Sequence, residues 1–183
     1  MKLKEKAYKK NTVYKGKAVD FCNDTVILPN NKKATREYID HPGAVAVVPF
    51  VNKTDIIFVK QFRYPVNEIT YEIPAGKLDK KESLLKCAKR ELEEETGYKT
   101  KNIKKLISFW PTPAFSNEEL YIYTATNLIP GKSHPDSDEF VNTVIIPFKK
   151  ALQMIYNGKI KDSKTIIALT VLASSIKNSE IIK

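Results

Sequence analysis

The sequence predicts a mixed α+β fold, and three features of the chain lead to that prediction. Strand-length segments, apolar or alternating, follow one another through much of the chain. One long amphipathic segment with helical spacing, residues 79–96, interrupts them, and two further helix-like segments end the chain. The 183 residues contain no internal repeat or low-complexity stretch, so the chain has the size of one domain with a small additional layer.

The N-terminal region is expected to be a series of short strands. Its strand-like segments are residues 13–14, 18–21, 25–28 and 36–39, with a turn at 29–31. Residues 43–50 form a continuous apolar run, which is typical of a strand covered on both faces. Residues 55–63 follow after a turn at 52–54, so the two segments are expected to pair as a hairpin.

A helix is expected over residues 79–96, after a short strand at 70–73. Asp79 and Glu82 have the spacing of a capping box, and Gly97 is a natural residue to end the helix. The remaining elements are strands at 105–109, 120–125 and 141–146, a polar loop at 131–138, and helices at 148–157 and 164–177.

The composition describes a basic chain without signs of a membrane or nucleic-acid protein. The formal net charge is +10, from 31 basic and 21 acidic residues, but the lysines are scattered and lack the aromatic partners of an RNA-binding module. No run of about 18 apolar residues exists, and the first residues lack the apolar block of a secretion signal. Cys22 and Cys87 lie in apolar segments and are expected to be small buried hydrophobes, so a reducing, cytoplasmic environment is expected.

Three carboxylates gather on one edge of the predicted helix. At 100° per residue, Glu91, Glu94 and Glu95 span about 100° of arc beside the apolar stripe. Like charges at this spacing repel each other, and they lie near the negative end of the helix dipole. Hard oxygen ligands at this density suit Mg²⁺ or Mn²⁺, although a solvated acidic face would show the same composition.

The stretch from Gly76 to Tyr98 resembles the Nudix box. That pattern is Gly, five residues, Glu, seven residues, Arg-Glu, an aliphatic residue, one residue, Glu-Glu, one residue, Gly and a hydrophobe. The matching residues are Gly76, Glu82, Arg90, Glu91, Leu92, Glu94, Glu95, Gly97 and Tyr98. The resemblance implies the Nudix fold, an α/β/α sandwich, over residues 41–183, with residues 1–40 as an N-terminal antiparallel β extension.

The resemblance also implies a role for each residue of the motif. Glu91 and Glu95 are expected to hold magnesium, with manganese as a substitute, and Glu94 and the backbone carbonyl of Ala75 are expected to join them. The remaining motif residues are expected to brace the loop–helix–loop rather than touch substrate; they are Gly76, Glu82, Arg90 and Gly97.

Segments outside the box are similar to ADP-ribose pyrophosphatases from about residue 13 to residue 172. These segments are 36–37, 43–47, 61–65, 72–78 and 111–118. The resemblance implies hydrolysis of ADP-ribose to AMP and ribose 5-phosphate. The base that activates water is expected in the acidic loop before the strand at 141–146, with Glu139 the first candidate and Asp138, Asp136 and Glu94 the alternatives.

Substrate contacts are expected from Arg63, Arg36 and Glu118. A guanidinium matches phosphate oxygens in a bidentate manner, so Arg63 is the candidate diphosphate contact and Arg36 the second; both could instead be surface arginines. Glu118 is expected to bind a ribose hydroxyl. Family members are commonly homodimers, so residues 1–40 are expected to reach a partner subunit and the adenine, with Tyr14 and Phe21 as candidate ring contacts.

Two alternative classes of function stay open. A related enzyme would cleave another nucleoside diphosphate sugar or a dinucleoside polyphosphate. A protein of a different class would be a non-catalytic Nudix module that binds nucleotides or RNA. The presence of Glu91, Glu94 and Glu95 argues against the second class, because a pure binding protein has no need of all three carboxylates.

Overall fold

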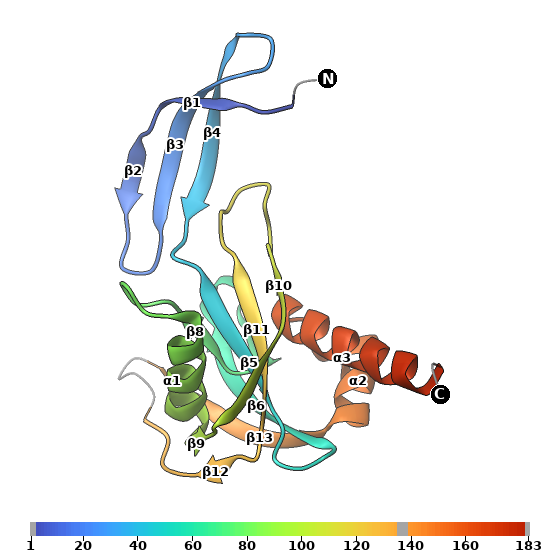
Figure 1. Cartoon of the computed structure of the whole chain (residues 1–183). Coiled ribbons are helices and arrows are strands. Elements are labelled where there is room, and N and C mark those ends of the chain that lie inside the picture. Colours follow the sequence, from blue (N-terminus) through green and yellow to red (C-terminus); the bar gives the residue numbers. More distant parts are fainter. Residues whose placement is uncertain (1–2, 135–138, 182–183) are drawn as a thin grey trace. The chain divides into compact units, whose positions relative to one another are not determined.

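The computed structural model describes residues 3–134 and 139–181, and the chain divides into two compact units (Figure 1). The first unit comprises Met1–Gly43 and Trp110–Glu119, and the second comprises Ala44–Phe109 and Leu120–Lys183. In the described ranges, no helix has both the length and the apolar character needed to cross a membrane.

The first unit is a four-stranded antiparallel sheet built around one long strand. Its strands are β1 (Lys6–Lys9), β2 (Thr12–Lys15), β3 (Asp20–Ile27) and β4 (Lys33–Asp40). The β4 strand runs along the whole of one side of β3, and β1 and β2 follow each other along the other side. The two strands expected at 18–21 and 25–28 are therefore one strand, because β4 pairs without a break from Asp40 to Lys33.

The segment Trp110–Glu119 joins this unit through β4. The Ile39 N–H donates to the Phe115 carbonyl at 2.9 Å, and the Asn117 N–H donates to the Ile39 carbonyl at 3.3 Å. The Asn117 side chain adds a bond from the His41 N–H at 2.7 Å. A segment distant in sequence thus supplies hydrogen bonds to the end of β4.

The second unit contains two larger sheets and a short two-stranded ribbon. The first sheet has the order β10 (Asn102–Phe109), β11 (Leu120–Thr126), β5 (Ala44–Pro49) and β8 (Ala75–Lys77). The second has the order β13 (Asn142–Pro147), β6 (Asp55–Arg63) and β7 (Glu68–Glu72), and a 3₁₀ helix, η1 (Tyr64–Val66), joins β6 to β7. The ribbon pairs β9 (Tyr98–Lys99) with β12 (Ile129–Pro130).

The hairpin expected between residues 43–50 and 55–63 is wrong, because β5 and β6 belong to different sheets. Only the Phe50–Ile56 bridge and the bond from the Val51 N–H to the Asp55 carbonyl link the two segments. The parallel strand β11 takes one edge of β5 and β8 takes the other, so β5 has no free edge for β6.

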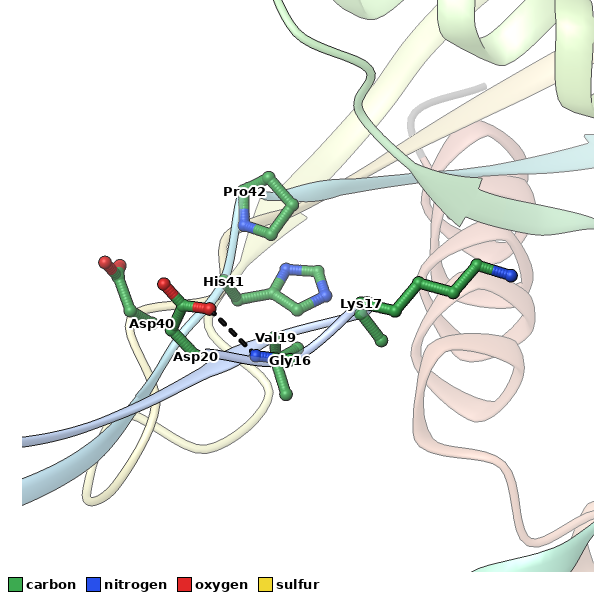
Figure 2. Close-up of a pocket in the computed structure, with 8 residues that line it drawn as sticks. Gly16, Lys17, Val19, Asp20, Asp40, His41 and Pro42 are labelled. Atoms are coloured by element: carbon green, nitrogen blue, oxygen red, sulfur yellow. Dashed lines mark hydrogen bonds between the residues drawn. The ribbon is translucent and has the colours of Figure 1, made fainter. Parts of the chain in front are cut away.

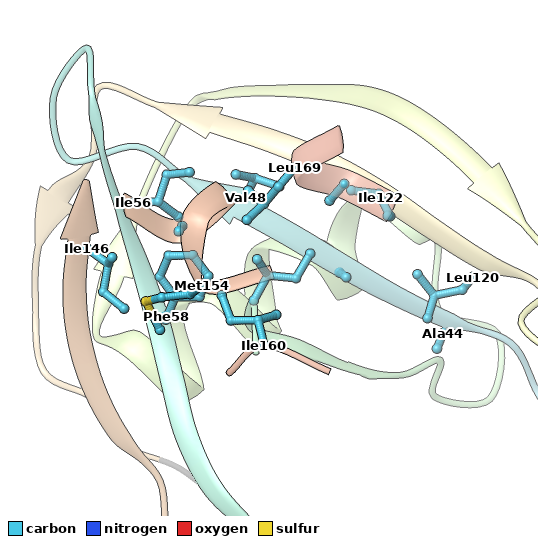
Figure 3. Close-up of a cluster of buried hydrophobic side chains, with 14 residues drawn as sticks. Ala44, Val48, Ile56, Phe58, Leu120, Ile122, Ile146, Met154, Ile160 and Leu169 are labelled. Carbon is cyan, nitrogen blue, oxygen red and sulfur yellow. The ribbon is translucent and has the colours of Figure 1, made fainter. Parts of the chain in front are cut away.

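Both faces of β5 are buried, as its continuous apolar sequence predicts. Val45 and Val47 pack against Cys87, Ala88 and Leu92 of α1 (Leu84–Thr96). The other face joins a larger cluster with the second sheet, α2 (Phe148–Tyr156) and α3 (Ser163–Ile181); Figure 3 labels Val48, Phe58, Ile122, Met154 and Leu169 in it. The second unit therefore has helices on both faces of a central sheet, which confirms the mixed α+β, α/β/α prediction. Both cysteines are buried and free, also as expected.

The start of α1 differs from the expected capping box. The helix begins at Leu84, and Ser83 is its N-cap, with its hydroxyl accepting the Lys86 N–H at 3.4 Å. Asp79 and Glu82 instead form a turn before the helix, in which the Glu82 N–H donates to the Asp79 carbonyl at 2.9 Å. Lys81 in that turn has a φ of 66°, a left-handed conformation that a helix cannot contain.

Candidate active site

The junction of β8 and α1 brings the sequence motif into one compact arrangement. Gly76 lies in β8 opposite Val45, and the Glu91 carboxylate of α1 lies directly against it. A Cβ atom placed on Gly76 would come within 2.0 Å of Glu91 Oε1. A larger residue at this position would therefore displace the Glu91 carboxylate from its place against β8.

Glu91 and Glu95 are buried carboxylates with raised pKa values. They are 8% and 4% exposed, and Glu95 Oε2 accepts the Ala75 N–H at 3.0 Å. Burial raises the pKa of Glu91 to about 7 despite the opposing charge of Arg90, with Glu94 and Glu139 adding to the rise. Burial likewise raises the pKa of Glu95 to about 8, with Glu91 and Glu139 adding to the rise.

Arg90 links the helix to the turn before it. Its Nε and Nη2 bind the Glu82 carboxylate at 3.0 and 2.9 Å, and Nη2 also donates to the Lys77 carbonyl at 3.1 Å. Its Nη1 contacts Glu91 at 2.6 Å and Glu94 at 2.9 Å. Hydrogen bonding to Arg90 lowers the pKa of Glu82 to about 2, against a smaller opposing effect of burial. These contacts join the turn before α1 to the helix.

The carboxylates have the chemistry of a divalent-metal site, although they are not gathered as one. Within residues 3–134 and 139–181, no three His, Cys, Asp or Glu side chains come close enough together to hold an ion. Glu94 accepts a hydrogen bond from Arg90 Nη1, and the same nitrogen donates to Glu91. Two buried acidic groups with raised pKa values, beside a third carboxylate, form a donor set that favours a hard cation.

The segment that leads to Glu139 is anchored on the C-terminal end of α1. Gly97 has a φ of 76° and ends the helix as expected, with its N–H donating to the Glu93 carbonyl at 2.7 Å. The backbone of Gly131 and Ser133 crosses so close to Gly97 that a Cβ there would lie 2.7 Å from the Ser133 nitrogen. The described segment that precedes residues 135–138 and Glu139 is therefore held against α1. Its charge raises the pKa of both Glu91 and Glu95, whereas Asp136 and Asp138 lie outside the described residues.

A second charged cluster in the same unit surrounds Arg63. Its Nε and Nη2 donate to the two oxygens of Glu72 at 2.8 and 2.7 Å, and Lys164 binds the same carboxylate. Glu72 is 2% exposed, yet these cations lower its pKa to about 2 although burial alone would raise it. The cluster borders a cavity of about 590 Å³, whose lining includes Arg63, Glu68, Thr70, Glu72, Lys161 and Lys164.

Sequence reasoning singled out Arg63 but missed Glu72 and Lys164 as members of its cluster. A signal for Glu72 was present, because an acidic residue stands among apolar residues at the end of an expected strand. Lys164 gave no such signal, since it comes from another part of the chain and resembles the surface lysines.

The other predicted substrate contacts belong to the first unit. Arg36 forms an ion pair with Glu5, with its Nε donating to Glu5 Oε2 at 3.0 Å. The Glu118 N–H donates to the Ser116 hydroxyl at 3.1 Å in the segment bound to β4. Tyr14 and Phe21 are 66% and 39% exposed, so neither is part of a core in this unit.

The first unit also contains a hollow of about 340 Å³, between residues 16–20 and 40–42 (Figure 2). In it, the Gly16 N–H donates to the Asp20 carboxylate at 3.2 Å, closing the turn between β2 and β3. Asp40 accepts the side-chain amide of Asn117, and the His41 ring accepts the Gly43 N–H at 3.0 Å. None of the residues predicted to bind metal or substrate lines this hollow.

The chain is similar to known proteins in its domain, its sequence and its fold. Residues 40–168 match the model of the NUDIX domain. The chain is 40% identical over 172 residues to an ADP-ribose pyrophosphatase of Bacillus subtilis strain 168, and 42% identical over 172 residues to a methanol dehydrogenase activator of Bacillus methanolicus. Each alignment covers 93% of this chain and 93% of the relative.

A solved structure described as an ADP compounds hydrolase has a similar fold. It superimposes with a TM-score of 0.83 and covers 98% of both chains, at 19% sequence identity. At that identity the likeness concerns the fold alone.

Proposed function

The chain belongs to the NUDIX family, and from that membership we propose that it hydrolyses ADP-ribose to AMP and ribose 5-phosphate. Water attacks one phosphorus of the diphosphate, and the P–O bond to the bridging oxygen breaks. One phosphate is then part of AMP, and the other is part of ribose 5-phosphate. The observation that carries the proposal is the pair of buried carboxylates, Glu91 and Glu95, packed against Ala75 and Gly76. The relative from Bacillus subtilis supports the choice of substrate.

Family members generally use divalent metal cations, and we propose Mg²⁺, with Mn²⁺ as a substitute. Glu91, Glu95, Glu94 and the Ala75 carbonyl would hold it. When bound, the metal neutralises the diphosphate and polarises a phosphorus. Arg90 is a neighbouring cation that keeps Glu91 and Glu94 oriented, and Gly76 keeps the space that the Glu91 carboxylate fills.

Glu139 is the proposed general base, which accepts the proton of the attacking water. Its charge acts on both Glu91 and Glu95, so it faces the carboxylate cluster. The segment before residues 135–138 is anchored on α1, since the His134 N–H donates to the Glu94 carbonyl at 3.0 Å. Glu94 is the alternative base, and Asp136 and Asp138 stay further alternatives.

The variant Glu139→Gln tests the base. Turnover should fall by roughly 10²–10⁴-fold, the usual contribution of a positioned base, with little change in KM. Steady-state kinetics with ADP-ribose measure both parameters. Near-normal turnover in this variant, together with an inactive Asp138→Asn variant, would transfer the role to Asp138.

Arg63 is the proposed diphosphate contact. Its bonds to Glu72 fix the plane of the guanidinium, and within the described residues no acceptor occupies Nη1. Its side chain is 45% exposed beside the cavity, so an anion can reach it. Arg36 and Glu118 stay candidate contacts to phosphate and ribose.

We also propose a homodimer formed through the N-terminal sheet. All residues of β1 and β2 are exposed, and three exposed apolar side chains of the sheet are Tyr8, Val13 and Tyr14. An isolated sheet with such side chains in water favours association. Light scattering of the full chain and of Tyr14→Lys tests the assignment, and a wild-type monomer at micromolar concentration would contradict it.

A substrate panel tests the proposed function most directly. With Mg²⁺ present, ADP-ribose should be hydrolysed with a higher kcat/KM than ADP-glucose, GDP-mannose, NADH or diadenosine polyphosphates, and the products should be AMP and ribose 5-phosphate. A preference for another compound would keep the reaction class and replace the substrate. An inactive protein that binds nucleotide would favour the non-catalytic alternative.

The relative from Bacillus methanolicus supports a second candidate function, activation of a dehydrogenase. It would require the chain to act in a complex with an alcohol dehydrogenase. The specific test adds the purified chain to such an enzyme and measures the rate of alcohol oxidation. Stimulation that disappears with Glu95→Gln would link activation to the same active site.

A further inference from the structure

A network of hydrogen bonds joins the start of α3 to the end of β7. The buried Glu72 accepts from Thr70 Oγ1 at 2.6 Å and from Arg63, and Lys164 Nζ binds the same carboxylate. Lys164 also donates to Asp162 Oδ1 at 2.9 Å. The side chain of Lys164 is only 10% exposed, so its ammonium group is held between two carboxylates rather than presented to solvent.

Thr165 closes this network into a ring. Its N–H and hydroxyl donate to Asp162 Oδ2 at 3.0 and 2.5 Å, and its hydroxyl oxygen accepts the Ile73 N–H at 2.9 Å. Ile73 directly follows the last residue of β7, and two residues later the Ala75 N–H binds Glu95. The first turn of α3 therefore holds the strand segment that enters the carboxylate cluster.

The charges of the ring balance only when Lys164 is included. Arg63 and Lys164 carry two positive charges, and Glu72 and Asp162 carry two negative charges. Without Lys164 the group would be a net anion, and Glu72 would draw more strongly on Arg63. The electrostatic potential around the Arg63 guanidinium would then be less positive, so an anionic diphosphate would be attracted less strongly.

We propose that Lys164 is a positioning residue of the hydrolysis, which by neutralising Glu72 keeps Arg63 oriented toward, and available to, the diphosphate. Lys164 acts without touching the substrate, because both of its ion pairs are to protein carboxylates. This inference rests on the proposed function and extends it to α3, which carries none of the motif residues.

The variant Lys164→Met tests the inference, with Lys161→Met as its matched control. Lys161 borders the same cavity but pairs with the exposed Glu68, so its loss should raise the KM for ADP-ribose by less than the loss of Lys164 does. Lys164→Met should raise the KM for ADP-ribose about tenfold and change kcat less than about threefold, because it weakens binding rather than the chemical step. Lys164→Arg, which keeps the charge, should recover most of the lost affinity.

A double variant distinguishes action through Glu72 from direct contact with substrate. Glu72→Gln/Lys164→Met should have the same KM as Glu72→Gln, because the Glu72 charge through which Lys164 is proposed to act is already gone, whereas, among the described residues, the Lys164–Asp162 pair does not contact Arg63. A further increase in KM would overturn the inference. The double variant removes both charges, so it serves as the test if Lys164→Met does not fold by circular dichroism.

Two other results have distinct meanings. A wild-type protein that hydrolyses no ADP-ribose would overturn the proposed function. An active wild-type protein, with Lys164→Met and Lys161→Met kinetically equal, would overturn the inference alone.

Discussion

Glu72 and Glu95 are glutamates of the same unit with nearly equal burial, 2% and 4% exposed, yet their ionisation is opposite. The pKa of Glu72 falls to about 2 because Arg63 and Lys164 outweigh the effect of burial. The pKa of Glu95 rises to about 8 because burial dominates and the nearby Glu91 and Glu139 add negative charge.

The difference shows that burial alone does not determine the pKa of a carboxylate. Where the chain supplies its own cations, as at Glu72, the charge is already compensated and can orient a neighbour such as Arg63. Where the chain supplies too few, as at Glu91 and Glu95, the negative charge is uncompensated, and under the proposed function a cation from solution would compensate it. The second arrangement destabilises the metal-free protein and provides the affinity for a metal.

Removing the uncompensated carboxylates gives the largest expected effect. Glu91→Gln and Glu95→Gln should each lower kcat/KM by at least about 10³-fold, because the metal loses a ligand. In EDTA, each should unfold at a higher temperature than the wild type, because a repelled charge is removed. Steady-state kinetics with Mg²⁺ measure the first effect, and scanning calorimetry in EDTA measures the second.

Glu93→Gln is the matched control, since Glu93 lies on the same helix but pairs with Lys99. It should be active and should keep the wild-type response to metal. Full activity in Glu91→Gln or Glu95→Gln would remove the basis for the metal assignment.

A methyl group at Gly76 should disturb the same cluster less severely. Gly76→Ala places a Cβ on the Glu91 carboxylate, so the side chain must move and activity should fall roughly 10²-fold. Isothermal titration with Mg²⁺ should show weaker binding. The double variant Gly76→Ala/Glu91→Ala should be as stable as Glu91→Ala, and additional destabilisation would show that the clash is with other atoms.

Removing the compensated carboxylate should destabilise the protein instead of stabilising it. Glu72→Gln leaves Lys164 and Arg63 without their shared partner and should cost about 2–3 kcal/mol, a value reduced for the partial exposure of Arg63. Urea denaturation measures the change. Glu68→Gln, which breaks an exposed ion pair, should cost less than about 1 kcal/mol.

The pH dependence of stability should separate the two clusters. In EDTA, stability should decrease as pH rises from about 5 to about 8, because unfolded Glu91 and Glu95 ionise more readily than the folded residues with their raised pKa values. Below about pH 4, stability should fall again as pH approaches about 2, where folded Glu72 and Glu82, whose pKa values are both lowered to about 2, become protonated. Each group contributes at most about 1.4 kcal/mol per pH unit.

Thermal melts from pH 3 to pH 9 record both limbs. The double variant Glu91→Gln/Glu95→Gln should lose the decrease at neutral pH and keep the decrease in acid. A wild-type curve that rises between pH 5 and pH 8 would contradict the raised pKa values.

Local patterns in the sequence were sufficient for the body and the end of α1. The 3.6-residue spacing separated its apolar stripe from its carboxylates, and Gly97 ended it where expected. Its start was placed too early because Asp79 and Ser83 both have cap chemistry. The choice depends on the left-handed Lys81, whose conformation no short pattern encodes.

Features that depend on distant partners could not be predicted from the sequence. The strand at residues 43–50 was recognised, but its pairing with β11 was not. Parallel partners are joined by a long crossover, so β11 lies far from β5 in the sequence and no local pattern links them. Lys164 is separated from Glu72 by 92 positions, and a lysine near the start of a helix carries no sign of burial. Motif spacing therefore identified the helix that carries Glu91, Glu94 and Glu95, whereas the compensated cluster around Glu72 emerged only from the fold.

The meeting of Gly97 and Gly131 has a consequence for how this chain can change in length. The segment 98–130 begins and ends beside the C-terminal end of α1, where β9 pairs with β12. The entropic cost of lengthening a loop whose ends are already fixed grows only slowly. Insertions in the connections of this segment, outside β10 and β11, can therefore lengthen the chain while α1 and the segment at Gly131 keep their common anchor.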